Sequence, residues 1–558
     1  MPDSDYLEGA NPYPSSAIEQ YTAQGWWLGL TYGDILDRSA ARYPDKLAVI
    51  DERTRLTYAE LRKSVDRFAI ALLRLGVRRY DRLLLQLPNR HEFVVAFFAM
   101  QRIGAVPVLA IPRHGHREVS YLCSLAEPVG WVVALRDGER DFLPLIETIR
   151  AEAPSLRHLI VVGDDPLPPG ALAMEELIAA VDLDDHPAGY LQQFRPDPND
   201  VALIMPTGGT TGLVKGVPRT HNSYLASIRH TAEDLRPDDV MGLATPIGHS
   251  MAQQGAVGGS IFTGATLALV ASPQARTILE AIGRYGITTI GVVPTQIEDM
   301  LQCPDLDSYD LSSLRRIKTA GAALRSESAA KAEELFAGIG ARFDGGEFGS
   351  SEGPAARHYP DESPEVFRTS VGRPMCPGDR WKVIDEEERE LPPNVEGELA
   401  ARGPLVFTGY YKSDAENREI FTADGYYRMG DLGKIDEQGH IFVTGRKKDV
   451  IQRGGEGIVP SEMERLISMH PSVDAAAVVG IPDPRLGEKA CAYVALKPAR
   501  TLSLEELTAF LRGLGAGKLL LPERLETVEA LARTALGKVD KKALRADVER
   551  KLRQEGVL

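Results

Sequence analysis

Cysteine is scarce in this sequence, and none of it stands in a short paired motif. The four cysteines among 558 residues lie far apart, at Cys123, Cys303, Cys376 and Cys491. Without a Cys-x-x-Cys pair, the sequence indicates neither a structural zinc site nor a disulfide scaffold. A reducing compartment fits this pattern.

Long apolar runs and an excess of positive charge are also missing. The longest lipid-like stretch, residues 93–100, is far shorter than the roughly 20 residues that a membrane span needs. The start, MPDSDYLEGANPYP, is acidic and polar where a signal peptide would be basic and then apolar. Lys and Arg number 64 against 79 Asp and Glu, which argues against nucleic acid or an anionic membrane as partner. We therefore expect a cytoplasmic protein that binds neither.

The remaining composition is that of a large globular protein. Hydrophobic residues make up 43% and charged residues 26% of the chain, and 558 residues exceed what one hydrophobic core supports. Between about residues 30 and 345, short apolar runs alternate with amphipathic helical segments such as 91–103. Strands are expected at 82–87, 105–111, 129–135, 159–162, 201–204, 265–270, 288–293 and 316–319. This alternation predicts a large, multi-layer α/β domain.

The pattern of residues changes after Glu352. Short strands punctuated by Gly and Pro, as in VEGELAARGP, predict a β-rich subdomain. A compact α+β unit follows, with expected helices at 460–469 and 504–511 and strands at 475–479 and 491–496. The charged segment RKKD, residues 446–449, is typical of a joint, so we predict one domain over 1–447 and a small second one over 448–558.

The segment MPTGGTTGLVKG, residues 205–216, is rich in glycine and threonine and follows an expected strand. Open backbone N–H groups, the hydroxyls of Thr207, Thr210 and Thr211, and the ammonium of Lys215 together suit a polyphosphate. It is not a Walker A sequence, because two residues separate Gly212 from the lysine. By itself, the segment is equally consistent with an ordinary surface turn.

Further motifs follow this loop in a fixed order, and each of them is weak alone. They are TAGAAL (319–324), EFGSSEG (347–353), GELAARGP (397–404), YRMGDLG (427–433), TGRKKD (444–449) and RTALGKVDKK (533–542). Together they resemble the adenylate-forming superfamily of acyl-CoA synthetases, peptide-synthetase adenylation domains and luciferases. Within it, PRTH (218–221), GHS (248–250) and QRGGEGI (452–458) look most like the enzymes that activate salicylate or dihydroxybenzoate.

The resemblance implies the activation of a carboxylic acid with ATP and Mg²⁺, followed by transfer to a thiol. It implies Lys538, His249 and Glu352 as catalytic residues, with Glu352 also as the metal ligand. The implied ATP-binding residues are Thr207, Gly208, Gly209, Thr210, Thr211, Gly212, Lys215, Gly321, Ala322, Glu347, Phe348, Gly349, Ser351, Asp431, Arg446 and Lys538. It also implies that the C-terminal domain is mobile, with Lys448 as the hinge.

The pocket for the acid follows from the same resemblance. Its implied lining is His249, Ser250, Gly255, Gly321, Gly346 and Ala355. Three of these, Ser250, Gly255 and Ala355, are smaller than the side chains usual in salicylate-type enzymes. We therefore expect an acid larger than salicylate, such as a substituted or bicyclic aromatic acid from a secondary-metabolite pathway. The alternative is that Met251 or Gln254 refills the space.

Several alternatives stay open at this point. Coenzyme A and the phosphopantetheine arm of a carrier protein are both possible acceptors, with coenzyme A slightly favoured, and the chain could be a monomer or a homodimer. A nucleotide-binding module without turnover and a luciferase-like monooxygenase are the competing functions. The sequence departs from the usual family pattern at Met429, Gly346, Ala532 and Leu520, and none of these departures removes a charged catalytic group.

Overall fold

The computed structural model describes residues 6–208, 214–320, 326–359, 361–453, 456–534 and 538–557. Its contacts divide the chain into two compact units. The first unit comprises Met1–Pro360, Arg373–Arg380 and Arg402–Gly425, and the second comprises Asp361–Gly372, Trp381–Ala401 and Tyr426–Leu558. A domain boundary between residues 447 and 448 stays a prediction.

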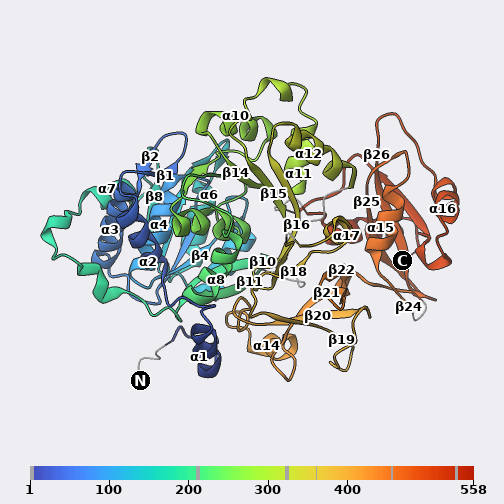
Figure 1. The fold of residues 1–558 in the computed structure, drawn as a ribbon, viewed down its shortest axis with the longest axis horizontal. Coiled ribbons are helices and arrows are strands. Elements are labelled where there is room, and N and C mark those ends of the chain that lie inside the picture. Colours follow the sequence, from blue (N-terminus) through green and yellow to red (C-terminus); the bar gives the residue numbers. More distant parts are fainter. Residues whose placement is uncertain are drawn as a thin grey trace. The chain divides into compact units, whose positions relative to one another are not determined.

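The first unit contains a seven-stranded sheet that is parallel except at its β10–β11 edge (Figure 1). Its strands, in spatial order, are β11 (Val214–Thr220), β10 (Val201–Gly208), β4 (Val106–Leu109), β3 (Arg82–Gln86), β5 (Gly130–Ala134), β8 (His158–Val162) and β9 (Ala171–Ala173). Their near-continuous apolar sequences suit strands that are buried on both faces.

A nine-stranded sheet also belongs to the first unit. Its order is β18 (Arg373–Pro374), β17 (Ala355–Arg357), β16 (Arg342–Gly349), β15 (Arg316–Ala320), β14 (Thr289–Val292), β12 (Val240–Leu243), β13 (Thr266–Leu269), β1 (Leu47–Ile50) and β2 (Arg55–Thr57). The strands from β16 to β1 run parallel, and the edge strands are antiparallel. Ligands of such sheets bind at the carboxyl ends of the parallel strands.

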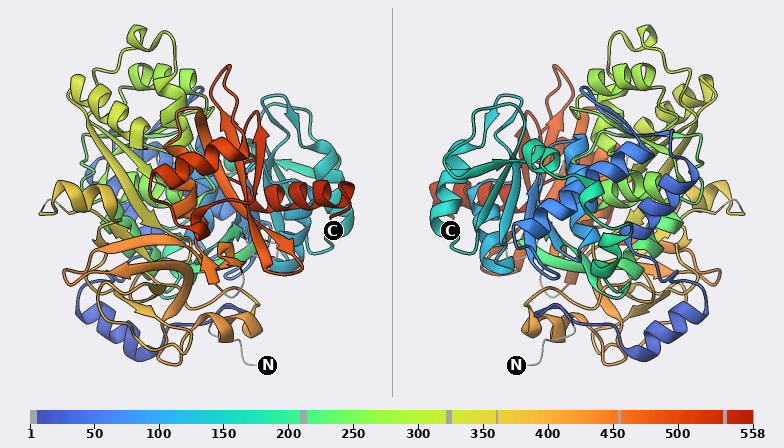
Figure 2. Two further views of the ribbon diagram at one scale, coloured as in Figure 1. Left: turned by 90° about the vertical axis from the view of Figure 1, so that its right-hand side faces the viewer. Right: turned by 90° about the vertical axis from the view of Figure 1, so that its left-hand side faces the viewer.

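Helices fill the space between these two sheets. Helix α3 (Tyr58–Arg74) contacts β1 and β2 of the larger sheet, α4 (His91–Arg102) contacts β3 and β4 of the smaller one, and the two helices pack on each other. With α2 (Tyr32–Arg42) they form the blue layer in the right-hand view of Figure 2. Every residue from Glu92 to Arg102 in α4 is buried, which explains why its apolar run has no polar face.

The first unit contains further helices. The remaining helices of the first unit are α1 (Ser15–Ala23), α5 (His116–Ala126), α6 (Leu143–Glu152), α7 (Met174–Ala179), α8 (His221–Thr231), α9 (Gly259–Thr263), α10 (Ala275–Tyr285), α11 (Pro294–Leu301), α12 (Ser326–Gly338) and α14 (Asp414–Ile420). Helices α11 and α12 pack against β15 and β16 (Figure 1).

The second unit begins with a four-stranded sheet, the predicted β-rich subdomain. Its strands are β19 (Arg380–Ile384), β20 (Gly397–Arg402), β21 (Tyr427–Ile435) and β22 (Ile441–Arg446). A short helix, α13 (Pro364–Thr369), belongs to the same unit.

The C-terminal part of the second unit is a sheet with helices on both faces, drawn in orange and red in Figure 2. Its strands are β23 (Ile451–Arg453), β24 (Glu456–Ile458), β25 (Val473–Asp483), β26 (Gly487–Leu496) and β27 (Arg524–Val528). Strand alternation divides the core: Ala477 and Val479 face α17 (Lys541–Gln554), while Val478 lies in the cluster with α15 (Pro460–Ser468) and α16 (Leu504–Gly513).

The predicted α/β fold class is confirmed, and so are the expected strands and helices, within a few residues at their ends. No helix in the described ranges is long and apolar enough to cross a membrane. All four cysteines are free thiols. The mobility of the C-terminal domain stays a prediction.

Candidate active site

The glycine-rich segment forms the end of a hairpin at the edge of the seven-stranded sheet. Strands β10 and β11 pair antiparallel, with Thr207 opposite Lys215 and Gly208 opposite Val214. Four predicted phosphate-binding residues, Gly209, Thr210, Thr211 and Gly212, lie outside the described residues. The hairpin therefore fixes Thr207 and Lys215 as neighbours at the base of the loop.

The ammonium of Lys215 is held by two side chains from the segment around α14. It forms an ion pair with Glu416 and lies 4.5 Å from the ring centroid of Tyr410. The lysine side chain is only 15% exposed. An ammonium with one carboxylate partner and an aromatic face is positioned to exchange that carboxylate for another anion.

The buried carboxylate of Glu352 joins the same group of residues. Its Oε1 accepts a hydrogen bond of 2.9 Å from the hydroxyl of Tyr410, whose ring lies beside Lys215. The backbone oxygen of Glu352 accepts from the N–H of Phe407 at 2.7 Å. Carboxylate oxygens are the ligands that Mg²⁺ takes from proteins, so Glu352 fits the predicted metal-binding role.

The turn that carries Glu352 requires glycine at the next position. Gly353 has a φ of +116°, and a Cβ there would lie 1.8 Å from the carbonyl oxygen of Leu405. The EFGSSEG segment thus lies directly against the backbone of Leu405, and this close approach fixes the backbone position of the neighbouring Glu352.

Arg219 is a functional candidate that the sequence analysis missed. This buried guanidinium donates through Nη1 to the Ser351 carbonyl at 2.9 Å and through Nη2 to the Leu405 carbonyl at 2.7 Å. It therefore joins the two chain segments that meet at Gly353. The available signal was an arginine within the otherwise apolar strand segment VPRT, where an unpaired charge would be costly.

A second buried group lies near this arginine. Asp379 accepts a 3.2 Å hydrogen bond from the N–H of Leu405 through Oδ1, and burial raises the pKa of its carboxyl to about 8, although that hydrogen bond and the charge of Arg219 lower it. This buried carboxyl binds the backbone of Leu405, which indicates a structural role.

The GHS motif precedes an unusual helix. Residues Ala252–Gly258 form a π-helix, which is rare in proteins and frequent at functional sites. Nδ1 of His249 accepts a 3.4 Å hydrogen bond from the N–H of Met251. The hydroxyl of Ser250 accepts from the amide of Gln254 at 3.1 Å, so Gln254 takes up part of the space beside the small Ser250.

Thr231, at the end of α8, contacts the position of Gly255 directly and is linked to Ala355 through Met375. A Cβ on Gly255 would lie 3.7 Å from the γ-methyl of Thr231. The hydroxyl of Thr231 lies 3.6 Å from the sulfur of Met375, and the N–H of Met375 donates to the Ala355 carbonyl at 2.8 Å. The two predicted pocket residues are therefore linked through Thr231 and Met375.

The other predicted residues of this region follow the ends of two adjacent strands. Gly346, Glu347, Phe348 and Gly349 lie in β16, and Phe348 and Gly349 pair with Ala356 and Ala355 of β17. Gly321 and Ala322 follow β15 but lie outside the described residues. The side chain of Glu347 lies 3.6 Å from the ammonium of Lys318, a partner that the sequence did not reveal.

In the second unit, Asp431 and Arg446 are directly paired. They are opposite residues of β21 and β22, and Nε of Arg446 lies 3.0 Å from Oδ1 of the buried aspartate. The neighbouring Lys447 pairs with Glu398 at 3.0 Å. Burial, together with the charge of Arg446, lowers the pKa of Lys448, which is the predicted hinge residue.

Lys538 lies on an exposed loop between β27 and α17. Its carbonyl accepts a 2.7 Å hydrogen bond from the N–H of Thr534, and Asp540 caps the start of α17 by accepting from the N–H of Ala543. The backbone of the predicted catalytic lysine is therefore tied to that of Thr534, and the residue is exposed.

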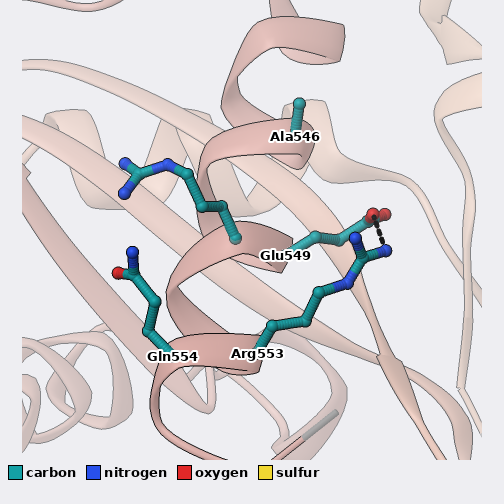
Figure 3. A pocket seen from close by; sticks show the side chains of 5 residues that line it. Ala546, Glu549, Arg553 and Gln554 are labelled. Atoms are coloured by element: carbon teal, nitrogen blue, oxygen red, sulfur yellow. Dashed lines mark ion pairs between the residues drawn. The ribbon is translucent and has the colours of Figure 1, made fainter.

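A surface depression on α17 stands apart from all these residues. It measures about 420 Å³ and is lined by Ala546, Glu549, Arg550, Arg553 and Gln554. Figure 3 shows these side chains on successive turns of one helix, with an ion pair between Glu549 and Arg553. Since one helix alone lines it, no convergent set of groups defines a ligand there.

Two family models match the sequence, one described as AMP-binding enzyme over residues 36–411 and one as AMP-binding enzyme C-terminal domain over 462–538. The 2,3-dihydroxybenzoate-AMP ligase of Bacillus subtilis is 34% identical over 98% of this chain and 99% of its own. The 2-hydroxy-7-methoxy-5-methyl-1-naphthoate–CoA ligase of Streptomyces carzinostaticus is 34% identical over 96% and 97%. The solved structure of the anthranilate CoA ligase AuaEII with anthranoyl-AMP has 25% identity and a TM-score of 0.82, covering 94% and 98%.

Proposed function

Because the chain belongs to the AMP-binding, adenylate-forming enzyme family, we propose that it activates a bicyclic or substituted aromatic acid larger than salicylate. The product of the first reaction is an aryl adenylate, and the acyl group then passes to the thiol of coenzyme A. The observation that carries this proposal is the small size of two linked residues: Gly255 faces the γ-methyl of Thr231, and Ala355 is linked to the same threonine through Met375. Larger side chains at these positions would narrow the space for the acid.

In the first half-reaction, a carboxylate oxygen of the acid attacks the α-phosphate of ATP and pyrophosphate leaves. Lys215 exchanges Glu416 for the β- and γ-phosphates, and Lys538 neutralises charge between the acid and the α-phosphate. Such positioned cations act where the charge develops in the transition state. When bound, Mg²⁺ supplies further charge neutralisation on the phosphate oxygens, and Glu352 is the residue that would hold it.

The remaining nucleotide contacts are assigned to the other motif residues. Asp431 accepts hydrogen bonds from the ribose hydroxyls, with Arg446 fixing the orientation of its carboxylate. Phe348 offers its ring to adenine. In the second half-reaction the thiol attacks the acyl carbonyl, the carbon–sulfur bond forms, and AMP leaves with the bonding electrons.

We also propose that the second half-reaction follows a rotation of residues 448–558 about Lys448. This rotation withdraws Lys538 and admits the thiol. We favour coenzyme A as the acceptor, because one relative is a naphthoate–CoA ligase. A carrier protein is the alternative. Comparing thioester formation with coenzyme A and with a phosphopantetheinylated aryl carrier protein separates them.

Pyrophosphate exchange with salicylate and with 2-hydroxy-1-naphthoate tests the size of the acid. We expect a higher kcat/KM for the bicyclic acid, and Ala355→Val should lower kcat/KM for that acid selectively. Gly255→Ser is a matched second variant, because its Cβ would meet Thr231 at an ordinary van der Waals distance of 3.7 Å. A clear preference of the unaltered protein for salicylate contradicts the proposal.

A further inference from the structure

A lysine and a glutamate lie side by side on the two strands that end at the candidate site. Lys318 is in β15 and Glu347 in the adjacent β16. The ammonium and the carboxylate are 3.6 Å apart, and the side chains are 14% and 22% exposed. The register of this strand pair shifts between Lys318 and Ala320, and the shift sets Glu347 opposite Ala320.

The pair is hydrogen-bonded to Thr231, the residue that faces Gly255 and is linked to Ala355 through Met375. The ammonium of Lys318 donates a 3.3 Å hydrogen bond to the carbonyl of Thr231. The γ-methyl of the same threonine faces Gly255, and its hydroxyl lies against Met375, next to Ala355. All these residues belong to the first unit.

Lys318 is set back from the edge where the nucleotide is expected. Gly321 and Ala322, the predicted adenine-side residues, follow the end of β15, whereas Lys318 precedes that end by two residues. At about 3.3 Å per strand residue, this is roughly 7 Å deeper in the sheet. The carboxylate of the acid must lie beside the nucleotide, because it attacks the α-phosphate. A ligand group that reaches Lys318 therefore lies at the end of the acid remote from its carboxylate.

The chemistry of the pair favours one kind of ligand group. A separation of 3.6 Å is an ion-pair distance but is too long for a hydrogen bond. Two mostly buried charges gain little from each other at that distance, because the loss of water costs more than their attraction returns. A phenolic hydroxyl can accept from the ammonium and donate to the carboxylate at once, and so satisfies both.

We propose that Lys318 and Glu347 bind a hydroxyl group that the aromatic acid carries on the ring remote from its carboxylate. This inference rests on the proposed function and deepens it, since it names the substrate class as distally hydroxylated bicyclic aryl acids. It also assigns the Glu347 side chain to the acid rather than to the nucleotide. The two residues determine specificity, and the reacting atoms are elsewhere.

The test compares 2-hydroxy-1-naphthoate with the 2,5-, 2,6- and 2,7-dihydroxy-1-naphthoates by pyrophosphate exchange. The unaltered protein should prefer at least one dihydroxy acid by tenfold or more in kcat/KM. Lys318→Met should lower kcat/KM for that acid 10- to 100-fold and change it less than threefold for the monohydroxy acid. Glu347→Gln preserves shape and should weaken the same preference, which keeps the test decisive if the lysine variant does not fold.

Arg342→Met is the matched control, because it removes a 65% exposed cation from the same strand as Glu347. It should leave the preference intact. Equal losses for all acids in Lys318→Met and Glu347→Gln, or no preference in the unaltered protein, overturn the inference. Exchange with none of the aryl acids would instead overturn the proposed function, so the two failures are distinguishable.

Discussion

The two compact units hold their candidate catalytic groups in opposite ways. In the first unit, Lys215 and Glu352 are largely buried and linked through Tyr410, and Lys215 also pairs with Glu416. In the second unit, Lys538 is exposed on a loop. A group that is fixed by neighbours is ready before the ligand arrives, whereas an exposed lysine avoids the cost of desolvation until it is needed.

This difference matches the two half-reactions. Phosphate and metal binding need groups that stay in place, and under the proposed function Lys538 is needed in only one half-reaction. Asp431 shows that the second unit can also fix a side chain, because Arg446 holds it within a strand pair. The contrast therefore reflects the role of each residue and not a general looseness of the second unit.

The largest expected effect follows from removing the exposed lysine. Lys538→Ala should abolish adenylation, because one preorganised cation at the phosphate transition state contributes on the order of 3 kcal/mol, about a hundredfold or more in rate. Thioester formation from a supplied aryl adenylate should persist. Single-turnover assays of each half-reaction measure both, with Lys542→Ala as the control on the same surface. Equal loss of both half-reactions contradicts the assigned role.

A substitution at the proposed hinge should impair thioester formation and spare adenylation, the opposite of the Lys538 variant. Proline fixes φ near −65° and removes a backbone donor, so Lys448→Pro should hold one orientation of the C-terminal domain. Adenylation should survive while thioester formation falls at least tenfold, and Lys448→Ala should retain both. If both rates of the proline variant stay normal, the hinge lies at another residue.

A smaller effect should come from loosening the fixed group in the first unit. Tyr410→Phe removes the hydroxyl that bonds Glu352 and keeps the ring beside Lys215. Because hydrogen bonds to charged groups are strong, adenylation should slow about tenfold and half-saturation should need more Mg²⁺. Titration of Mg²⁺ in the exchange assay measures this.

Tyr13→Phe provides the control for that variant, since its buried hydroxyl donates to the carbonyl of Val406 and not to a catalytic group. Indistinguishable Mg²⁺ requirements in the two variants would show that the Tyr410 contact is merely structural.

The smallest effect concerns stability and not activity. The pKa of Asp379 is raised from 3.8 to about 8 by burial, so the folded protein keeps a proton that the unfolded chain loses. The stability contribution of this carboxyl is therefore fully present below about pH 4 and falls as pH rises toward 8. Relative to the unaltered protein, the Tm of Asp379→Asn should rise by about 1–2 °C for each pH unit between 5 and 8. A Tm difference that is constant with pH would contradict the raised pKa.

The sequence predicted the strands and the order of the motifs well, because apolar runs and glycine-rich turns are local signals. It did not predict the partners of the motif residues. Glu416 lies 201 residues after Lys215, and Tyr410 lies 58 after Glu352. Arg219 and Lys318 were missed for the same reason. Which charge meets which carbonyl or carboxylate depends on how distant segments pack, and no spacing rule in one sequence encodes it.

The size of the pocket could not be predicted from the side chains alone. The small side chains at Ser250, Gly255 and Ala355 were visible in the sequence, but the hydrogen bond from Gln254 to Ser250 was not. This hydrogen bond shows that the space beside Ser250 is partly filled, whereas a Cβ on Gly255 would meet only Thr231 within 4 Å among the described residues beyond its own helix. The π-helix that contains Gly255 has no local sequence signature that 3.6-residue periodicity would reveal.

That π-helix has a consequence for how this region can vary. Its wider hydrogen-bonded turns use more residues to cover the same length than an α-helix does. Ala252–Gly258 therefore contains more residues than an α-helix of the same length, and a shorter sequence could span that length with α-helical turns. Single-residue deletions, which normally rotate everything downstream by about 100°, could be absorbed here while Ser250 before it and the strand β13 after it keep their places. A deletion in this segment could therefore change the pocket of a related protein while the strands of the sheet stay in place.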